Sequence, residues 1–267
     1  MSCAHRGDWK KHPENSFEGI QSAINAGIDA VEVDIQQTKD GKFILMHDET
    51  LNRTTNAEEI YPNGMDGSFC VSDWTFEQIQ DLRLKQGLGG ITAAVTEYRV
   101  PTLEEVMKLC RGKILINLDM SWNYRTQVWN IALAMDSTGN CIFKTAIENT
   151  TNINNFLDSA EVNSGKRPVF MRMLCWSIQD ALNYADGCYT ALNKLPVMVE
   201  MSLDNYNDNF DETLLAKIGN NMGIFGNALY TGIDDITNWK KMRDAGFNMI
   251  MTDDIPGLTS YINSLYK

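Results

Sequence analysis

Short apolar runs rich in β-branched residues alternate along this chain with stretches that have the apolar spacing of amphipathic helices. Strand–helix alternation of this kind is typical of a parallel sheet built from βαβ units. Helices are expected at 17–26, 74–84, 103–109, 124–135 and 236–245. Strands are expected at 2–5, 29–35, 43–47, 114–119, 141–145, 169–173, 197–201, 223–227 and 248–252.

The nine expected strands are one more than an eight-stranded barrel needs. Asp40-Gly41 indicates a tight hairpin between the second and third strands, which would place Asp34 opposite His47. Setting the hairpin strand aside leaves eight parallel strands, and the 267 residues suit a barrel of about 250. We therefore predict an α/β fold, a TIM (β/α)8 barrel, as one domain over residues 1–267. Residues 49–100 carry fewer strand patterns and are expected to form a small insertion after this N-terminal β-hairpin.

The formal charge of −12 opposes non-specific binding to nucleic acid or to anionic membranes. It does not exclude a small anionic substrate, because a bound metal ion can reverse the charge locally. No run approaches the ~20 apolar residues of a membrane span, so stable membrane insertion is not expected. Six cysteines without CxxC spacing predict neither a zinc cluster nor a disulfide framework. The first expected strand begins almost at Met1, so a periplasmic or secreted location is expected if an upstream signal segment was removed, and a cytoplasmic one otherwise. The composition leaves the oligomeric state open.

Glu32 and Asp34 lie two residues apart on an expected strand, so both side chains point to one face. Two acids inside a barrel need a cation or a proton, whereas on a half-exposed strand they would lie in water. The apolar run before them favours the buried alternative. Asp119 ends another strand and would be a third ligand, or else the N-cap of the next segment. Carboxylate ligands without thiols favour Mg²⁺ or Ca²⁺ over zinc.

His5 and His47 each end a short apolar strand, and together they suit a general acid and a general base. Arg6 offers a planar donor fork to phosphate oxygens, or an ordinary ion pair to Glu14 or Asp8.

Lys144 and Arg172 interrupt apolar strands and need partners there. The partner is either a substrate phosphate or a structural acid such as Glu200.

The chain resembles the glycerophosphodiester phosphodiesterase family through motifs that occur in order over nearly its whole length. These motifs are His5-Arg6-Gly7, Pro13-Glu14-Asn15, Glu32-Val33-Asp34, Lys39-Asp40-Gly41, His47-Asp48, Leu51-Asn52-Arg53-Thr54-Thr55, Val100-Pro101-Thr102-Leu103-Glu104-Glu105 and a closing Gly246…Thr252-Asp253.

The resemblance implies a metal-dependent TIM-barrel hydrolase of lipid and glycerol metabolism that cleaves glycerophosphodiesters to glycerol phosphate and an alcohol. It implies His5 and His47 as the acid–base pair and Arg6 as a phosphate contact. The metal ligands it implies are Glu32, Asp34 and Asp119.

This chain departs from the family pattern at three places. Asp119 stands where the family usually has glutamate, and Ser121 replaces a lysine two residues further on. Lys144 would supply that missing charge from the next strand and bind the phosphate. Phe225, in an altered aromatic motif, would keep an aromatic wall for the substrate.

Two other functions fit the same residues. One is phospholipase D-like action on choline phospholipids by the same scaffold. The other is a barrel that binds phosphodiesters without turning them over.

Overall fold

The computed structural model describes residues 1–145, 150–173, 198–202, 223–227, 229 and 234–266, and it has a strand at each of the nine expected places. Residue 197, the expected start of one of them, lies outside the described residues. Each strand differs from its expected bounds by two residues at most. The strands are β1 (Ser2–Ala4), β2 (Ala30–Gln37), β3 (Phe43–Leu45), β4 (Leu115–Asp119), β5 (Cys141–Thr145), β6 (Val169–Met173), β7 (Met198–Ser202), β8 (Gly223–Asn227) and β9 (Met249–Thr252).

Eight of these strands form a closed parallel barrel in the order β1-β9-β8-β7-β6-β5-β4-β2. The ring closes where β1 pairs with β2, with Cys3 beside Ala30 and Ala4 beside Val31. Every neighbouring pair in the ring is parallel. The predicted TIM barrel is therefore confirmed, and the carboxyl ends of its strands meet on one face.

The ninth strand, β3, forms the expected hairpin, but its register differs from the prediction. Ile35 pairs with Leu45 and Gln37 with Phe43, so Met46 rather than His47 lies opposite Asp34. The reason is the length of the turn. Thr38 N–H donates to the Lys42 carbonyl at 2.9 Å, which leaves a three-residue loop ending at Gly41 with φ 82°. A two-residue loop at Asp40-Gly41 would have given the predicted register.

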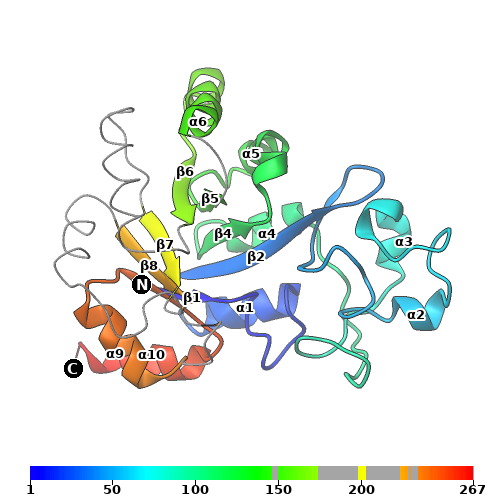
Figure 1. Cartoon of the computed structure of the whole chain (residues 1–267), viewed down its shortest axis with the longest axis horizontal. Coiled ribbons are helices and arrows are strands. Elements are labelled where there is room, and N and C mark those ends of the chain that lie inside the picture. Colours follow the sequence, from blue (N-terminus) through cyan, green and yellow to red (C-terminus); the bar gives the residue numbers. More distant parts are fainter. Residues whose placement is uncertain (146–149, 174–197, 203–222, 228, 230–233, 267) are drawn as a thin grey trace.

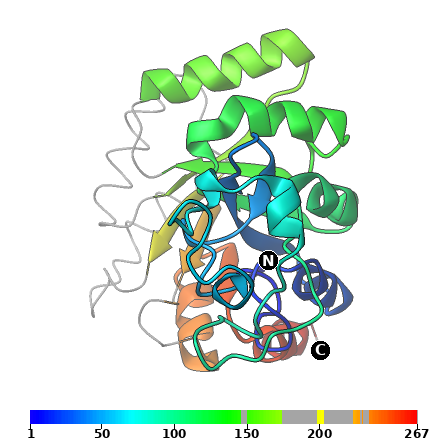
Figure 2. The same cartoon turned by 90° about the vertical axis from the view of Figure 1, so that its right-hand side faces the viewer.

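Helices cover the outside of the barrel (Figures 1 and 2). In Figure 1, α1, α9 and α10 lie below the strands, and α5 and α6 lie above them. Two helices begin with capping boxes, α3 at Thr75 and α4 at Thr102, each with its N3 side chain bonded back to the cap. The described helical elements are α1 (Phe17–Asn25), α2 (Ala57–Ile60), η1 (Val71–Asp73), α3 (Phe76–Gln80), α4 (Leu103–Cys110), η2 (Trp122–Tyr124), α5 (Arg125–Ala134), α6 (Thr150–Ser164), α9 (Ile236–Asp244) and α10 (Ile255–Ser264).

Residues from the segment after β3 pack around their own apolar cluster. Trp74, Leu51 and Leu84 are buried there, together with Ile44 of the hairpin. In Figure 1 this segment, with α2 and α3, projects to the right of the barrel. Among the residues that the structure describes, no helix is both long and apolar enough to cross a bilayer.

Inside the barrel, an apolar layer lies beneath the polar residues at the carboxyl ends of the strands. Cys3, Ile142, Met171 and Phe225 pack together there. The polar residues that follow on the same strands are therefore placed at the carboxyl ends, where a site forms in this fold.

Candidate active site

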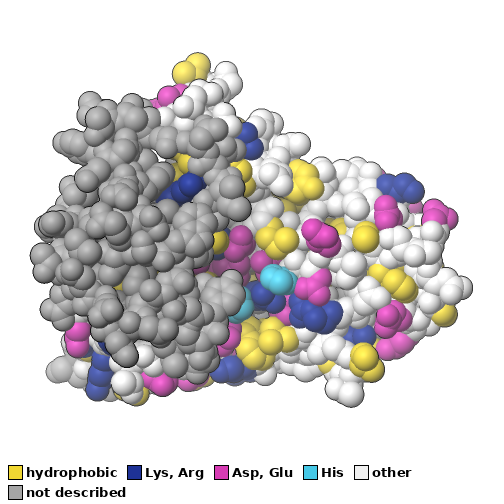
Figure 3. Space-filling view, viewed as in Figure 1, with side chains coloured by type: hydrophobic (Ala, Val, Ile, Leu, Met, Phe, Trp, Pro, Cys, Tyr) yellow, Lys and Arg dark blue, Asp and Glu magenta, His cyan; other side chains and the backbone are white. Residues whose placement is uncertain are grey.

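Six of the eight predicted site residues line one cavity of about 200 Å³. Figure 3 shows histidine side chains beside acidic and basic ones on this side of the molecule. Glu200 in β7, Asn227 at the end of β8 and Asp253 directly after β9 also line the cavity. The six predicted residues are His5, Arg6, Glu32, Asp34, His47 and Asp119.

Three carboxylates converge at the ends of β2 and β4. Glu32, Asp34 and Asp119 each bring an oxygen within 4.8 Å of the other two. The strand register explains this, because Asp34 pairs directly with Asp119 and Glu32 lies two residues before Asp34 on the same face. Carboxylate oxygens gathered this closely fit a hard divalent cation.

Burial of this cluster disfavours the ionised form of Glu32 and Asp34. It raises the pKa of Glu32 well above its usual value, and the neighbouring Asp34 adds to the shift. Burial also raises the pKa of Asp34, although the Arg6 guanidinium opposes that shift. Asn15 holds Asp34 in place by donating to Oδ2 at 2.8 Å and accepting from the Asp34 N–H at 3.1 Å. A bound cation would relieve the charge that burial concentrates here.

Asp119 is engaged on both oxygens. Its Oδ2 lies 2.8 Å from Lys144 Nζ, and its Oδ1 accepts from the Met120 N–H at 2.7 Å. Burial alone would raise the pKa of Asp119, but the Lys144 ammonium holds it below its usual value. The same ammonium donates to Glu200 Oε2 at 3.1 Å. Of the two kinds of partner expected for Lys144, the structural acid is present in the structure.

Each catalytic candidate histidine is bonded to an aspartate through Nδ1. His5 Nδ1 lies 2.8 Å from Asp253 Oδ1, and His47 Nδ1 lies 2.8 Å from Asp48 Oδ1. Trp9 Nε1 also donates to Asp253, at 2.6 Å. A carboxylate at Nδ1 fixes the ring and leaves Nε2 as the nitrogen that exchanges protons.

Arg53 connects His47 with Arg6, the predicted phosphate contact, through the carboxylates of Asp48 and Glu14. Its guanidinium binds Asp48 in a bidentate manner at 2.6 and 2.7 Å and Glu14 at 2.8 and 2.8 Å. Arg6 Nη1 donates to the same Glu14 at 3.3 Å, and Arg6 Nε lies 3.4 Å from Asp34 Oδ2. Hydrogen bonding to Arg53 lowers the pKa of Asp48 to about 2. The carboxylate that orients His47 is therefore ionised throughout the neutral range.

Sequence reasoning did not assign roles to Asp48, Asp253 or Arg53. Their signal was present, because Asp48 follows His47 directly and Asp253 follows the last strand.

The remaining predicted positions lie outside the cavity lining. Phe225 is fully buried in the apolar layer within the barrel, so we do not carry it into the proposed site. Ser121 is also buried, and its hydroxyl donates to the Leu118 carbonyl at 3.0 Å. Arg172 pairs with Thr145, whereas Lys144 pairs with Met171, so alternation turns Arg172 away from the barrel interior.

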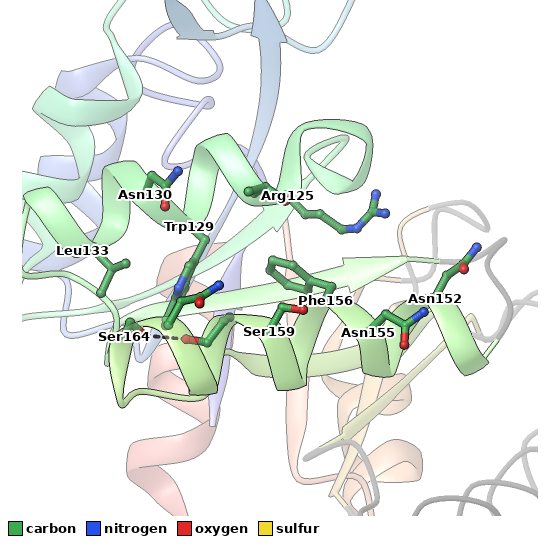
Figure 4. Close-up of a pocket in the computed structure, with 12 residues that line it drawn as sticks. Arg125, Trp129, Asn130, Leu133, Asn152, Asn155, Phe156, Ser159 and Ser164 are labelled. Carbon is green, nitrogen blue, oxygen red and sulfur yellow. Dashed lines mark hydrogen bonds between the residues drawn. The ribbon is translucent and has the colours of Figure 1, made fainter.

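A larger cavity of about 470 Å³ lies between α5 and α6, on the outside of the barrel (Figure 4). Trp129 and Phe156 project into the space between the two helices, and Arg125 lies at one end. Its lining within the described part of the chain contains neither a histidine nor a carboxylate. Cavity size therefore does not identify the active site here. The smaller cavity is the one that histidines and carboxylates line.

Known proteins resemble this chain in sequence and in fold. The model of the glycerophosphoryl diester phosphodiesterase family matches residues 5–256. A glycerophosphodiester phosphodiesterase of Caldanaerobacter subterraneus subsp. tengcongensis is 39% identical over 121 residues, and one of Bacillus altitudinis is 36% identical over 119. These alignments cover 45% and 44% of this chain, and 44% and 43% of the two relatives. The matched stretch thus spans less than half of each relative.

Solved structures share the fold over nearly the whole chain. A glycerophosphoryl diester phosphodiesterase from Parabacteroides distasonis superposes with a TM-score of 0.74 at 22% identity, covering 99% of this chain and 86% of that one. An Oleispira antarctica phosphodiesterase, solved with its product sn-glycerol-3-phosphate, gives 0.67 at 17% identity and covers 98% and 96%. At such identities the likeness shows the fold alone. Because the family model extends from the first catalytic candidate to the helix after β9, the chain belongs to the glycerophosphoryl diester phosphodiesterase family.

Proposed function

We propose that this protein hydrolyses glycerophosphodiesters to glycerol phosphate and an alcohol, with one divalent cation, Mg²⁺ or Ca²⁺, and a pair of histidines. One observation carries the proposal. Two histidines, each bonded to an aspartate, line the same cavity as the carboxylate cluster of Glu32, Asp34 and Asp119. Family membership and the printed names of the relatives support the substrate class.

The carboxylate cluster would hold the cation. When bound, the cation would supply positive charge to the phosphodiester oxygens. Arg6 would add its guanidinium, which Glu14 and Asp34 keep at the edge of the cavity. Its planar fork suits two phosphate oxygens at once. Electrostatic stabilisation of the phosphoryl group would thus come from groups that are already in place.

His5 and His47 would move the protons. One Nε2 would take a proton from the attacking water, or from a neighbouring hydroxyl of the substrate itself. The other would give a proton to the oxygen of the departing alcohol. Attack by the substrate hydroxyl would form a cyclic phosphate first. Asp253 and Asp48 would keep each ring oriented and stabilise its protonated form.

The proposal is tested by hydrolysis of a substrate panel after treatment with a chelator. The panel contains glycerophosphocholine, glycerophosphoethanolamine and two choline phospholipids, lysophosphatidylcholine and sphingomyelin. We expect turnover of the glycerophosphodiesters to disappear with chelator and to return with Mg²⁺ or Ca²⁺. Preference for the choline phospholipids would instead support phospholipase D-like action.

Variants of the three histidines separate catalysis from stability. His5→Ala and His47→Ala should each lower kcat by about 10²–10⁴-fold, the usual contribution of general acid–base catalysis. His12→Ala is the matched control, because His12 packs beside Tyr98 with the ring centroids 6.0 Å apart and does not line the cavity. Undiminished turnover in His47→Ala would remove that residue from the mechanism. Tight phosphodiester binding without turnover would indicate a binding protein.

A further inference from the structure

Asp119 stands between two charged groups. One of its oxygens lies within 4.8 Å of oxygens of Glu32 and Asp34, in the proposed cation site. Its Oδ2 also lies 2.8 Å from the ammonium of Lys144, whose other carboxylate partner is Glu200 at 3.1 Å. Asp119 is therefore placed as a carboxylate shared by two cationic positions, and in this structure the second position holds an ammonium.

The surroundings of the Lys144 ammonium resemble those of a metal ion. The Lys144 side chain is 2% exposed, and carboxylate oxygens from β4 and β7 lie close to its nitrogen. Asn227 orients Glu200 by donating from Nδ2 to Oε1 at 3.4 Å. Hard divalent cations prefer the same oxygen ligands.

Room for an ion exists beside this position. A cavity of about 260 Å³ is lined by Lys144, Asp119, Thr145 and Met173. It shares Asp119 and Met173 with the cavity of the two histidines. Asp119 and Met173 thus lie where the two cavities meet, and Lys144 lines the second one.

The four carboxylates around the Lys144 nitrogen and the proposed cation site require positive charge at the position of the ammonium. Glu32 and Glu200 are buried in the barrel, and Asp34 and Asp119 complete the group. Without the ammonium, Asp119 and Glu200 would lose a cationic partner in surroundings where unpaired charge is costly. Ser121 cannot replace it, because its hydroxyl is neutral and bonded to Leu118.

We propose that the Lys144 ammonium occupies the position of a second divalent cation, so that the site binds a single ion. Many enzymes that cleave phosphate esters use two ions about 3.5–4 Å apart, and carboxylates lie around both. Here a side chain supplies the second charge permanently, and Asp119 keeps the role of shared carboxylate. This proposal rests on the proposed cation site of Glu32, Asp34 and Asp119.

The test counts Mn²⁺ ions bound per chain, by equilibrium dialysis with elemental analysis. Electron paramagnetic resonance of the same samples detects coupling between neighbouring Mn²⁺ ions. The wild type should bind one ion. Lys144→Met should bind two, with a coupled signal. Lys144→Met combined with Glu200→Gln should return to one ion, because the second ion loses a ligand. Lys144→Arg, which keeps the positive charge, is the matched control and should bind one.

The possible outcomes separate this proposal from the proposed function. A wild type that binds no Mn²⁺ would remove the cation site itself. A wild type that binds two ions, or a Lys144→Met variant that binds one whether or not Glu200 is changed, would overturn only the role given to Lys144. If Lys144→Met is unfolded in chelator, Mn²⁺ should restore its circular dichroism spectrum. A variant that stays unfolded at saturating Mn²⁺ would also count against the proposal.

Discussion

Replacing Arg53 by methionine should destabilise the protein and release Asp48, the aspartate that holds His47. Arg53 makes two bidentate contacts, to Asp48 and to Glu14. The pKa of Asp48 falls from 3.8 to about 2, and each pKa unit corresponds to about 1.4 kcal/mol. The Asp48 side chain is 26% exposed, so solvent screening reduces this part to about 1–2 kcal/mol.

Loss of the contact between Arg53 and Glu14 lowers the free energy of unfolding further. Glu14 is 2% exposed, and after the substitution it keeps Arg6, whose contacts are longer, at 3.3 and 3.4 Å. A buried acceptor that loses a partner costs about 1–3 kcal/mol. The free energy of unfolding should therefore fall by about 2–5 kcal/mol in total. For a chain of this size, that lowers the melting temperature by roughly 5–15 °C.

The sign of the pH dependence gives a second check. The pKa of Asp48 is depressed in the folded state, so its stabilisation is present above the unfolded value and is lost as the pH falls towards about 2. The stability gap between wild type and Arg53→Met should thus be constant at neutral pH and shrink below about pH 4.

Urea unfolding at a series of pH values measures this gap. Arg243→Met is the control, because Arg243 pairs with Asp244 at an exposed position, where such pairs are worth at most about 1 kcal/mol. If Arg53→Met lowers the free energy of unfolding no more than this control does, or if the gap does not depend on pH, then the Arg53 contacts do not stabilise the protein in this way.

Three further changes have defined outcomes. Asp253→Asn should lower kcat by about 10²–10⁴-fold with little change in KM, because an amide favours the wrong tautomer of His5; steady-state kinetics checks this. Gly7→Ala should lower the free energy of unfolding by about 1–3 kcal/mol in urea melts, because Gly7 has φ 78° and an added Cβ would lie 3.0 Å from the Gly19 backbone. Mg²⁺ or Ca²⁺ at about 100 times its Kd should add about 2.7 kcal/mol of stability in thermal melts, and Asp34→Asn should abolish the gain.

The pattern of the sequence predicted the barrel and most of the site because both depend on local rules. Alternation placed Glu32 and Asp34 on one face, and the apolar run before Asp119 marked a strand end. Carboxyl ends of parallel strands meet on one face of a barrel, so residues far apart along the chain could be assigned to one cavity. Six of the predicted residues line it.

The error in the hairpin register arose where geometry beyond the local pattern decides. The register depended on whether the loop has two or three residues, and Thr38 favours three through its bond to Lys42. Phe225 lies in the apolar layer of the barrel, whereas Asn227, at the end of the same strand, lines the cavity.

Partners far apart in the sequence were only partly predictable. Glu200, 56 residues from Lys144, was among the partners expected for that lysine, because a cation in an apolar strand needs a neighbouring charge. Asp253 was not assigned to His5, because the two are 248 residues apart and come together only where β1 pairs with β9.

Phosphorus NMR of glycerophosphocholine incubated with the Mg²⁺- or Ca²⁺-loaded protein shows which ester bond breaks. We expect the diester signal to be replaced by that of glycerol phosphate, with a cyclic glycerol phosphate before it if the substrate hydroxyl attacks. After chelation, or with His47→Ala, the diester signal should persist over the time in which the wild type converts it. A phosphocholine signal, or conversion that persists in His47→Ala with chelator, would refute the proposed function.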